Sequence, residues 1–213
     1  MDALHQVWRD AYDRRFFVLA RSSKYPSSDH FMYTAGGFFS GARGSFFPGG
    51  NFNVVGSPLT IAHGYAFELD KTAVVVGPAG LAYDGDSDTL YVASELDNEI
   101  FALRGAGKTT SDLGTGDVIF SDSMHLRGPL GLILATNGHL ITANADPSSV
   151  TTSTAGPSEI VEFSKRGHFV RTFSIDSASG SAFALNELLK KEAIQFSYVD
   201  DTEATLTIWR LAD

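Results

Sequence analysis

Carboxylate and amide side chains stand just after several of the β-strands that the second half of the sequence predicts. Glu95, Asn144 and Asp200 follow three such strands, and Asn98 and Asp146 lie close to the first two of them. Carboxylate and amide oxygens are hard ligands, which suit calcium or magnesium better than a soft metal. The sequence requires no cofactor, but a calcium or magnesium ion would take Glu95, Asn144, Asp146 and Asp200 as its ligands.

A histidine and an arginine lie in the segment 121–127, between two predicted strands. His125 and Asp146 are the candidate catalytic residues, because either could move a proton while a metal polarises a carbonyl group. Arg127 is a candidate binding residue. The other candidate binding residues are Glu95, Asn98, Asn144 and Asp200.

Each candidate also has a structural interpretation. Asn and Asp side chains commonly bond to the backbone in turns, which explains Asn98, Asn144 and Asp200 more simply than metal binding does. His125 and Arg127 are explained in the same way as anchors of their loop. The acidic run at residues 84–88 lacks the glutamate that a calcium loop carries at its twelfth position, so it predicts a solvated turn.

Composition excludes several other functions. The 213-residue chain has no cysteine, which excludes disulfides, zinc–thiolate sites and thiol nucleophiles. No serine lies in a nucleophile elbow, so no Ser–His–Asp triad is expected. Sixteen basic against 25 acidic residues give a net charge of −9 and no basic run, which argues against nucleic-acid binding. No apolar run reaches about 18 residues, so no membrane-spanning segment is expected.

The elements that would position the candidates are short runs of Val, Ile, Phe, Tyr and Thr separated by turns, from residue 54 onward. These runs repeat at offsets of 50 and 51 residues, and one offset of 60 indicates an insertion of ten residues. The repeated segments are 78–82 and 129–133, then 90–93 and 140–143, then 99–103 and 159–163, with a weaker third copy at 183–185, 196–199 and 206–209.

A four-strand unit of about 40–50 residues is the period of a β-propeller blade. In each unit the P-x-G-L-A segment would be the innermost strand, where small residues let neighbouring strands approach closely. The loops after the second strands and before the innermost strands open on one face of a propeller, around its channel. This geometry brings Glu95, Asn144, Asp146 and Asp200 toward one channel mouth, with His125 and Arg127 beside them.

The segments P-x-G-L-A-x-D, L-Y-V-A-S and N-x-I-F-A-L resemble NHL-type β-propellers. Residues 128–146, 157–170 and 199–211 are similar to the C-terminal blades of an uncharacterised bacterial group with NHL-like repeats. The resemblance covers roughly residues 57–213. It implies an all-β fold, and a family that contains lactonases, lyases and noncatalytic binding modules.

Three blades and a partial strand at 54–62 are visible, whereas propellers typically use 4–8 blades. Either residues 20–53 form a diverged fourth blade, or two chains pair three plus three into a six-bladed homodimer. We favour the homodimer, because a two-fold arrangement buries two equivalent open faces at once.

Residues 1–53 form a separate region in this interpretation, and residues 54–213 form the propeller. The stripe of Leu4, Trp8 and Tyr12 predicts a short helix within residues 1–20, which Asp2 could cap. A Gly/Phe-rich segment follows at residues 35–50. Charged residues interrupt the first apolar stretch, so the sequence predicts no secretory signal and does not indicate a location.

We therefore expect an NHL-like binding or scaffold propeller whose polar channel mouth takes a small molecule, a glycan or a protein. The alternative is a divalent-metal-dependent hydrolase or lyase of the lactonase type, acting at the same mouth. The first function needs only the repeat, and the second also needs the polar loops to converge.

Overall fold

The structure is a computed structural model, and in the ranges that it describes the regular secondary structure consists of β-strands. Within these ranges no helix has the length and apolarity that a membrane span requires. The described residues are 4–9, 16–20, 31–35, 59–66, 77–144, 160–175, 177, 182–190, 193–200 and 202–211.

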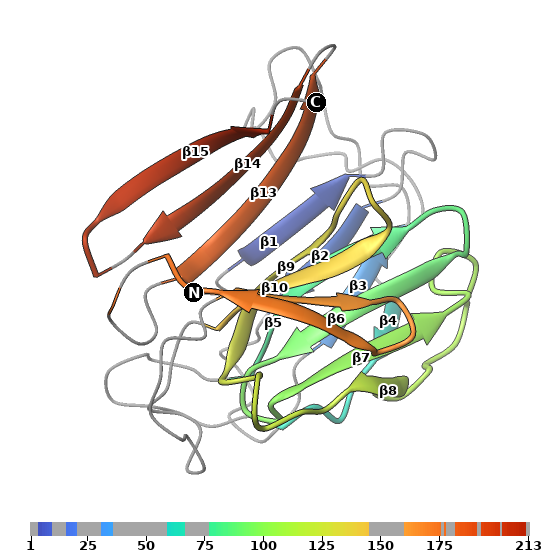
Figure 1. Ribbon diagram of the computed structural model, residues 1–213. Coiled ribbons are helices and arrows are strands. Elements are labelled where there is room, and N and C mark those ends of the chain that lie inside the picture. Colours follow the sequence, from blue (N-terminus) through green and yellow to red (C-terminus); the bar gives the residue numbers. More distant parts are fainter. Residues whose placement is uncertain are drawn as a thin grey trace.

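The strands form four antiparallel sheets, and each sheet takes its strands in chain order (Figure 1). Sheet 1 consists of β1 (Leu4–Arg9), β2 (Phe16–Ala20), β3 (Phe31–Ala35) and β4 (Leu59–Ala62). Sheet 2 consists of β5 (Pro78–Asp84), β6 (Thr89–Ser94), β7 (Glu99–Arg104) and β8 (Asp117–Phe120). Sheet 3 consists of β9 (Pro129–Leu134), β10 (His139–Asn144), β11 (Ile160–Ser164) and β12 (Phe169–Phe173). Sheet 4 consists of β13 (Ala182–Lys190), β14 (Ala193–Asp200) and β15 (Thr205–Leu211).

The sheets pack face to face in chain order, with the first strand of each against the first strand of the next. Two glycines allow this close approach. A Cβ atom on Gly80 would lie 2.2 Å from the carbonyl oxygen of Leu130, and one on Gly131 would lie 3.1 Å from that of Phe183. The prediction that the P-x-G-L segments form strands in close contact is therefore confirmed.

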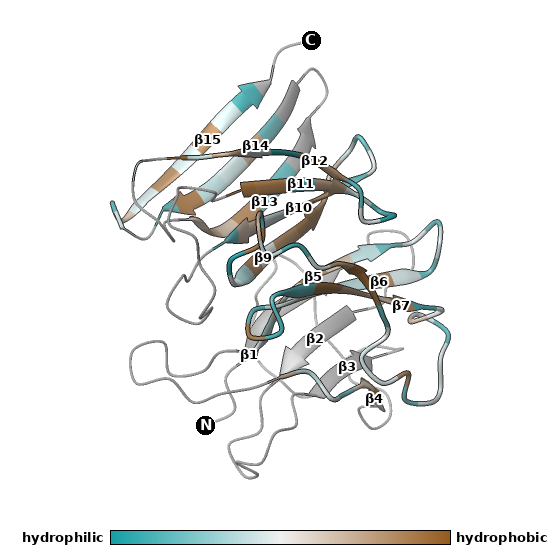
Figure 2. Ribbon diagram, turned by 60° about the horizontal axis from the view of Figure 1, so that its bottom comes forward, coloured by the Kyte–Doolittle hydropathy of each residue, from teal (hydrophilic) through white to brown (hydrophobic). Residues whose placement is uncertain are grey.

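Alternation along the strands gives sheets 2 and 3 two apolar faces each, as period-two geometry requires. On β6, Tyr91 and Ala93 pack toward sheet 3, whereas Leu90 and Val92 pack toward Ile61 of sheet 1. Figure 2 shows the same pattern as hydrophobic residues along β6 and β11 and hydrophilic residues in the turns. Burial on both faces explains why these strands are almost continuously apolar.

Sheets 2 and 3 are joined by an aromatic pair. Phe120, the last residue of β8, stacks on Phe163 of β11 with ring centroids 4.6 Å apart and an interplanar angle of 9°. Both rings are almost completely buried. The contact links the outermost strand of sheet 2 to the third strand of sheet 3.

The predicted N-terminal helix is not found, because β1 and β2 pair as antiparallel strands. Val7 lies opposite Val18, and Trp8 lies opposite Phe17. Residues of these types favour strands, and the spacing of Leu4 and Trp8 is compatible with a strand as well as with a helix.

β4 pairs with β3, so residues 59–62 complete a sheet with residues 31–35. The expected boundary between residues 53 and 54, and residues 36–50 of the Gly/Phe-rich segment, lie outside the described residues. The weaker third copy of the repeat is confirmed, since its three segments fall in β13, β14 and β15.

Candidate functional site

The candidate residues that the structure describes lie along one edge of the sheets, which we call the mouth-side edge. It is the edge at which the first strand of a sheet begins and the second strand ends. The register places Ser94 opposite Pro78 in sheet 2, Asn144 opposite Pro129 in sheet 3, and Asp200 opposite Ala182 in sheet 4. Asn144 and Asp200 therefore hold equivalent positions, and Glu95 lies one residue further on. Asp146 lies outside the described residues.

The side chain of Asn98 holds the loop that connects β8 to β9. Its Nδ2 donates a hydrogen bond to the carbonyl oxygen of Leu126 at 3.2 Å, and its Oδ1 accepts one from the backbone N–H of Gly128 at 3.0 Å. The backbone of Asn98 has a φ of 55°, in the left-handed region that asparagine tolerates. Both ends of the amide thus bond to backbone.

Asn144 holds the same loop from sheet 3. Its Oδ1 accepts a hydrogen bond from the backbone N–H of Arg127 at 3.0 Å, and its Nδ2 donates one to the carbonyl oxygen of His125 at 2.7 Å. The two asparagines therefore fix four consecutive residues of the loop from neighbouring sheets. The structure gives both of them the backbone-bonding role that the sequence left open.

Asp200 also bonds to backbone, since its Oδ1 accepts from the N–H of Glu203 at 3.0 Å. Its carboxylate is buried at the end of β14, and Glu95 is buried at 3% exposure just after β6. Among the described residues, no three His, Asp or Glu side chains lie close enough to hold a metal ion. Metal binding by Glu95, Asn144, Asp146 and Asp200 stays a prediction.

His125 is fixed on two sides. Its Nδ1 lies 2.5 Å from Oδ2 of Asp122, and its ring stacks on Phe169 with centroids 3.8 Å apart. Burial raises the pKa of Asp122, but hydrogen bonds from His125 and from the backbone N–H of Met124 outweigh burial and lower it. An ionised carboxylate therefore orients this imidazole, an arrangement that suits either an anchored loop or a general base.

Sequence reasoning selected His125 and missed both of its partners. Asp122 lies three residues before His125 in a turn, a spacing that could have indicated the pair. Phe169 belongs to β12 of the next sheet, and no local pattern connects it to His125.

Arg127 is the candidate whose guanidinium has hydrogen-bond donors without an acceptor among the described residues. Its side chain is 8% exposed, and within the described part of the chain its Nε and Nη1 are fully buried without a hydrogen-bond partner. A buried charged donor without an acceptor is costly. Its backbone is held by Asn144, so the guanidinium starts from a fixed position. An anionic group bound there would supply the missing acceptor.

At the opposite edge, the acidic run at residues 84–88 forms the expected turn between β5 and β6. Asp84 accepts from the backbone N–H of Asp86 at 3.1 Å and pairs with Lys165 of sheet 3 at 2.6 Å. Burial raises the pKa of Asp84, but the hydrogen bonds from Lys165 and Ser87 outweigh it and lower the pKa. The run is a structural turn that ties sheet 2 to sheet 3.

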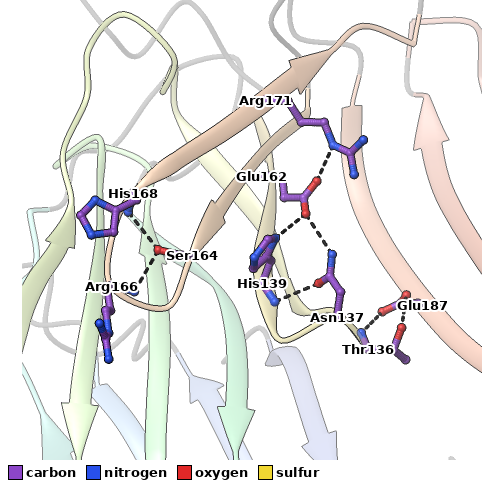
Figure 3. Close-up of polar contacts among 9 residues, drawn as sticks. All are labelled: Thr136, Asn137, His139, Glu162, Ser164, Arg166, His168, Arg171 and Glu187. Atoms are coloured by element: carbon purple, nitrogen blue, oxygen red, sulfur yellow. Dashed lines mark hydrogen bonds and ion pairs between the residues drawn. The ribbon is translucent and has the colours of Figure 1, made fainter.

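A second buried carboxylate, Glu162, lies on β11 of sheet 3 (Figure 3). It accepts from Arg171 Nε at 2.6 Å and from Asn137 Nδ2 at 3.0 Å, and it lies 2.6 Å from His139 Nδ1. Burial raises its pKa, but these three partners outweigh burial and lower it. Close by, Glu187 of sheet 4 accepts from the backbone N–H and the hydroxyl of Thr136.

No family model and no curated protein matches this chain. Solved structures similar to it include the following three. The calcium-binding protein regucalcin from Agrobacterium tumefaciens has a TM-score of 0.55 at 11% identity, over 98% of this chain and 59% of its own. A gluconolactonase from Xanthomonas campestris has 0.52 at 14%, over 98% and 58%. A structure of a nidogen/laminin complex has 0.50 at 12%, over 96% and 79%.

The chain spans about three-fifths of the length of the regucalcin and the gluconolactonase. At these identities the likeness concerns the fold and not the activity. The protein therefore has an all-β fold of antiparallel sheets stacked in chain order, consistent with a β-propeller.

Proposed function

We propose that this protein is a propeller-type binding protein whose mouth-side edge takes a ligand with a carboxylate or similar oxyanion group. The observation that carries the proposal is the buried guanidinium of Arg127, of which Nε and Nη1 have no hydrogen-bond partner among the described residues. Arginine presents a planar fork of donors that matches an oxyanion with two parallel hydrogen bonds.

The surrounding loop supports a binding role. Asn98 and Asn144 hold the backbone on both sides of Arg127 through four hydrogen bonds. A loop that is ordered before the ligand arrives loses little conformational entropy on binding, which favours affinity. Asn144, one of the side chains predicted as metal ligands, thus helps to position the arginine.

The test is thermal unfolding with D-gluconate, citrate or sulfate, and with D-glucose as the neutral control. An anion that binds the folded state raises Tm by mass action. We expect anions to raise Tm, glucose to leave it unchanged, and Arg127→Gln to abolish the response. The matched control is Arg104→Gln, because Arg104 is 68% exposed and pairs with Asp117. Absence of any anion response in the wild type, or its persistence in Arg127→Gln, would contradict the proposal.

A metal-dependent lactonase is the second candidate. Two features favour it: the buried carboxylates of Glu95 and Asp200 at this edge, and a fold shared with a gluconolactonase. The described side chains are poorly suited to bind a metal ion, however, because both ends of the Asn144 amide form hydrogen bonds to backbone. The binding function therefore stands first.

Calcium tests the second candidate. A bound ion at a hundredfold excess over Kd would stabilise the fold by about 2.7 kcal/mol. The lactonase proposal expects a rise in Tm with calcium or magnesium, its reversal by EDTA, and its loss in Glu95→Ala and Asp146→Ala. It also expects hydrolysis of D-glucono-1,5-lactone. No response to either ion would leave only the anion-binding function.

A further inference from the structure

The turn between β9 and β10 contains an asparagine that is followed by a glycine, Asn137 and Gly138. The sequence has six asparagines, and no other one precedes a glycine. The backbone of Gly138 has a φ of 79°, which glycine adopts without strain, and a Cβ atom there would meet no atom within 4 Å. Asn137 is exposed and Gly138 is half-buried. Water therefore reaches this turn, and no side chain crowds the backbone nitrogen of Gly138.

The side chain of Asn137 folds back over the peptide that follows it. Its Oδ1 accepts a hydrogen bond from the backbone N–H of His139 at 2.9 Å. This Asx-type bond holds the Cγ carbon close to the backbone nitrogen of Gly138 and polarises the carbonyl group at Cγ. The Gly138 N–H donates to the carbonyl oxygen of Ala135 at 2.9 Å. This one bond of an exposed turn must open before the nitrogen can attack, and such bonds open easily.

We infer that Asn137 deamidates spontaneously and that the product disrupts the network around Glu162. In the first step the backbone nitrogen of Gly138 forms a bond to Cγ of Asn137, and the Cγ–Nδ2 bond breaks. Nδ2 leaves as ammonia with the proton that the Gly138 nitrogen gives up, so a cyclic succinimide remains. Water then adds to one of the two ring carbonyls and breaks its C–N bond. The product is aspartate or isoaspartate at position 137.

The product carries a carboxylate where the network needs a hydrogen-bond donor. Asn137 Nδ2 donates to Oε1 of Glu162 at 3.0 Å, and Glu162 is 2% exposed (Figure 3). Deamidation would set a second carboxylate against this buried one, and two carboxylates that share a site repel each other strongly. The neighbouring Thr136 bonds to Glu187 of sheet 4 through its N–H and its hydroxyl. The modification therefore acts where sheets 3 and 4 are joined.

Mass spectrometry of peptides from the whole chain tests the modification. The purified protein is kept at mildly alkaline pH, and conversion is followed at Asn137 and at Asn186. Asn186 is the internal control, because it is also exposed but precedes Glu187. We expect Asn137 to convert about tenfold faster or more, which corresponds to a barrier lower by about 1.4 kcal/mol.

A variant of the next residue checks the mechanism. Gly138→Ala adds a Cβ beside the attacking nitrogen and should slow conversion at Asn137 to the rate at Asn186. The added methyl group has open space, so far-UV circular dichroism should show an unchanged fold. Equal rates at the two asparagines of the wild type would overturn the inference. An unchanged rate at Asn137 in the folded Gly138→Ala variant would also overturn it.

Urea unfolding tests the consequence for the network. Asn137→Asp imitates one product and should lower the unfolding midpoint at neutral pH. In a Glu162→Gln background the opposing charge is absent, so Asn137→Asp should lower the midpoint less. Asn186→Asp adds the same charge at an exposed position of β13 and should leave the midpoint unchanged. A loss that is equal in both backgrounds would overturn the link to Glu162. The turn lies at the edge opposite the mouth-side edge, so the anion response can succeed or fail independently.

Discussion

The interface between sheets 2 and 3 and the interface between sheets 3 and 4 use the same positions with different chemistry. At the first, Ala102 of β7 faces sheet 3 within an apolar cluster. At the second, the equivalent position holds Glu162, which is buried among His139, Asn137 and Arg171. The first strands also approach each other more closely at the first interface. A Cβ atom on Gly80 would lie 2.2 Å from backbone of sheet 3, whereas one on Gly131 would lie 3.1 Å from backbone of sheet 4. Both interfaces contain an apolar cluster, and the second one also accommodates a buried carboxylate with its polar partners.

The largest expected effect concerns the two glycines. Gly80→Ala would place a Cβ against backbone, which cannot rotate away, and should cost about 3 kcal/mol or prevent folding. Gly131→Ala meets a looser contact and should cost about 1 kcal/mol. Urea unfolding would compare their free energies of unfolding. Equal costs for the two variants would contradict the difference in closeness between the interfaces.

Next in size is the removal of the buried carboxylate. Glu162→Ala leaves Arg171, His139 and Asn137 without their acceptor, and should cost about 2 kcal/mol because part of the loss is recovered where Arg171 reaches solvent. Glu162→Leu should cost less, since an apolar side chain would imitate the first interface. Chemical denaturation of both variants decides the matter, and the prediction fails if Glu162→Leu is the less stable.

A smaller effect is expected from the asparagines at the mouth-side edge. Asn98→Ala and Asn144→Ala each remove two hydrogen bonds to loop backbone, and each should cost about 1–2 kcal/mol. Only Asn144 bonds to the backbone of Arg127, so Asn144→Ala should weaken the anion response more than Asn98→Ala does. Thermal unfolding with and without citrate measures both quantities. If citrate raised Tm equally in the two variants, the bond from Asn144 to the backbone of Arg127 would not matter for anion binding, and the prediction would be wrong.

The smallest effect is a dependence on pH at both interfaces. Asp84 and Glu162 each have a lowered pKa in the folded state. The unfolded state therefore binds more protons, so their stabilisation is present above the ordinary carboxyl pKa and is lost as pH falls through the lowered values. Free energies of unfolding between pH 7 and pH 3 should drop for the wild type. The drop should be shallower, by about 1 kcal/mol, in Asp84→Asn and Glu162→Gln.

The sequence predicted the strands and the repeat well, because these depend on local patterns. Gly80 and Gly131 could be recognised from their shared P-x-G-L setting, and both proved to lie at close strand contacts. The N-terminal helix is not confirmed, since the spacing of Leu4 and Trp8 fits either structure and residues 4–9 pair with β2 as a strand. A local pattern cannot reveal whether a segment finds another strand to pair with, which is what distinguishes the strand from the helix here.

The position of Asn144 and Asp200 at the ends of equivalent strands could be predicted from the repeat, whereas their hydrogen bonds could not. Asn144 and Asp200 do end equivalent strands, but their bonds to Arg127 and Glu203 depend on loop conformations that strand spacing does not specify. The unmet hydrogen bonding of Arg127 likewise follows from the absence of an acceptor among its described neighbours. Such an absence arises from the whole packing arrangement, so composition could not indicate it.

The stacked pair of Phe120 and Phe163 bears on how the chain folds while it is being synthesised. Phe120 ends the last strand of sheet 2, yet its cover comes from a strand of sheet 3 that the ribosome synthesises later. Until then β8 presents a large uncovered ring, which invites incorrect association. The completion of sheet 3 therefore removes apolar surface that sheet 2 alone would leave exposed.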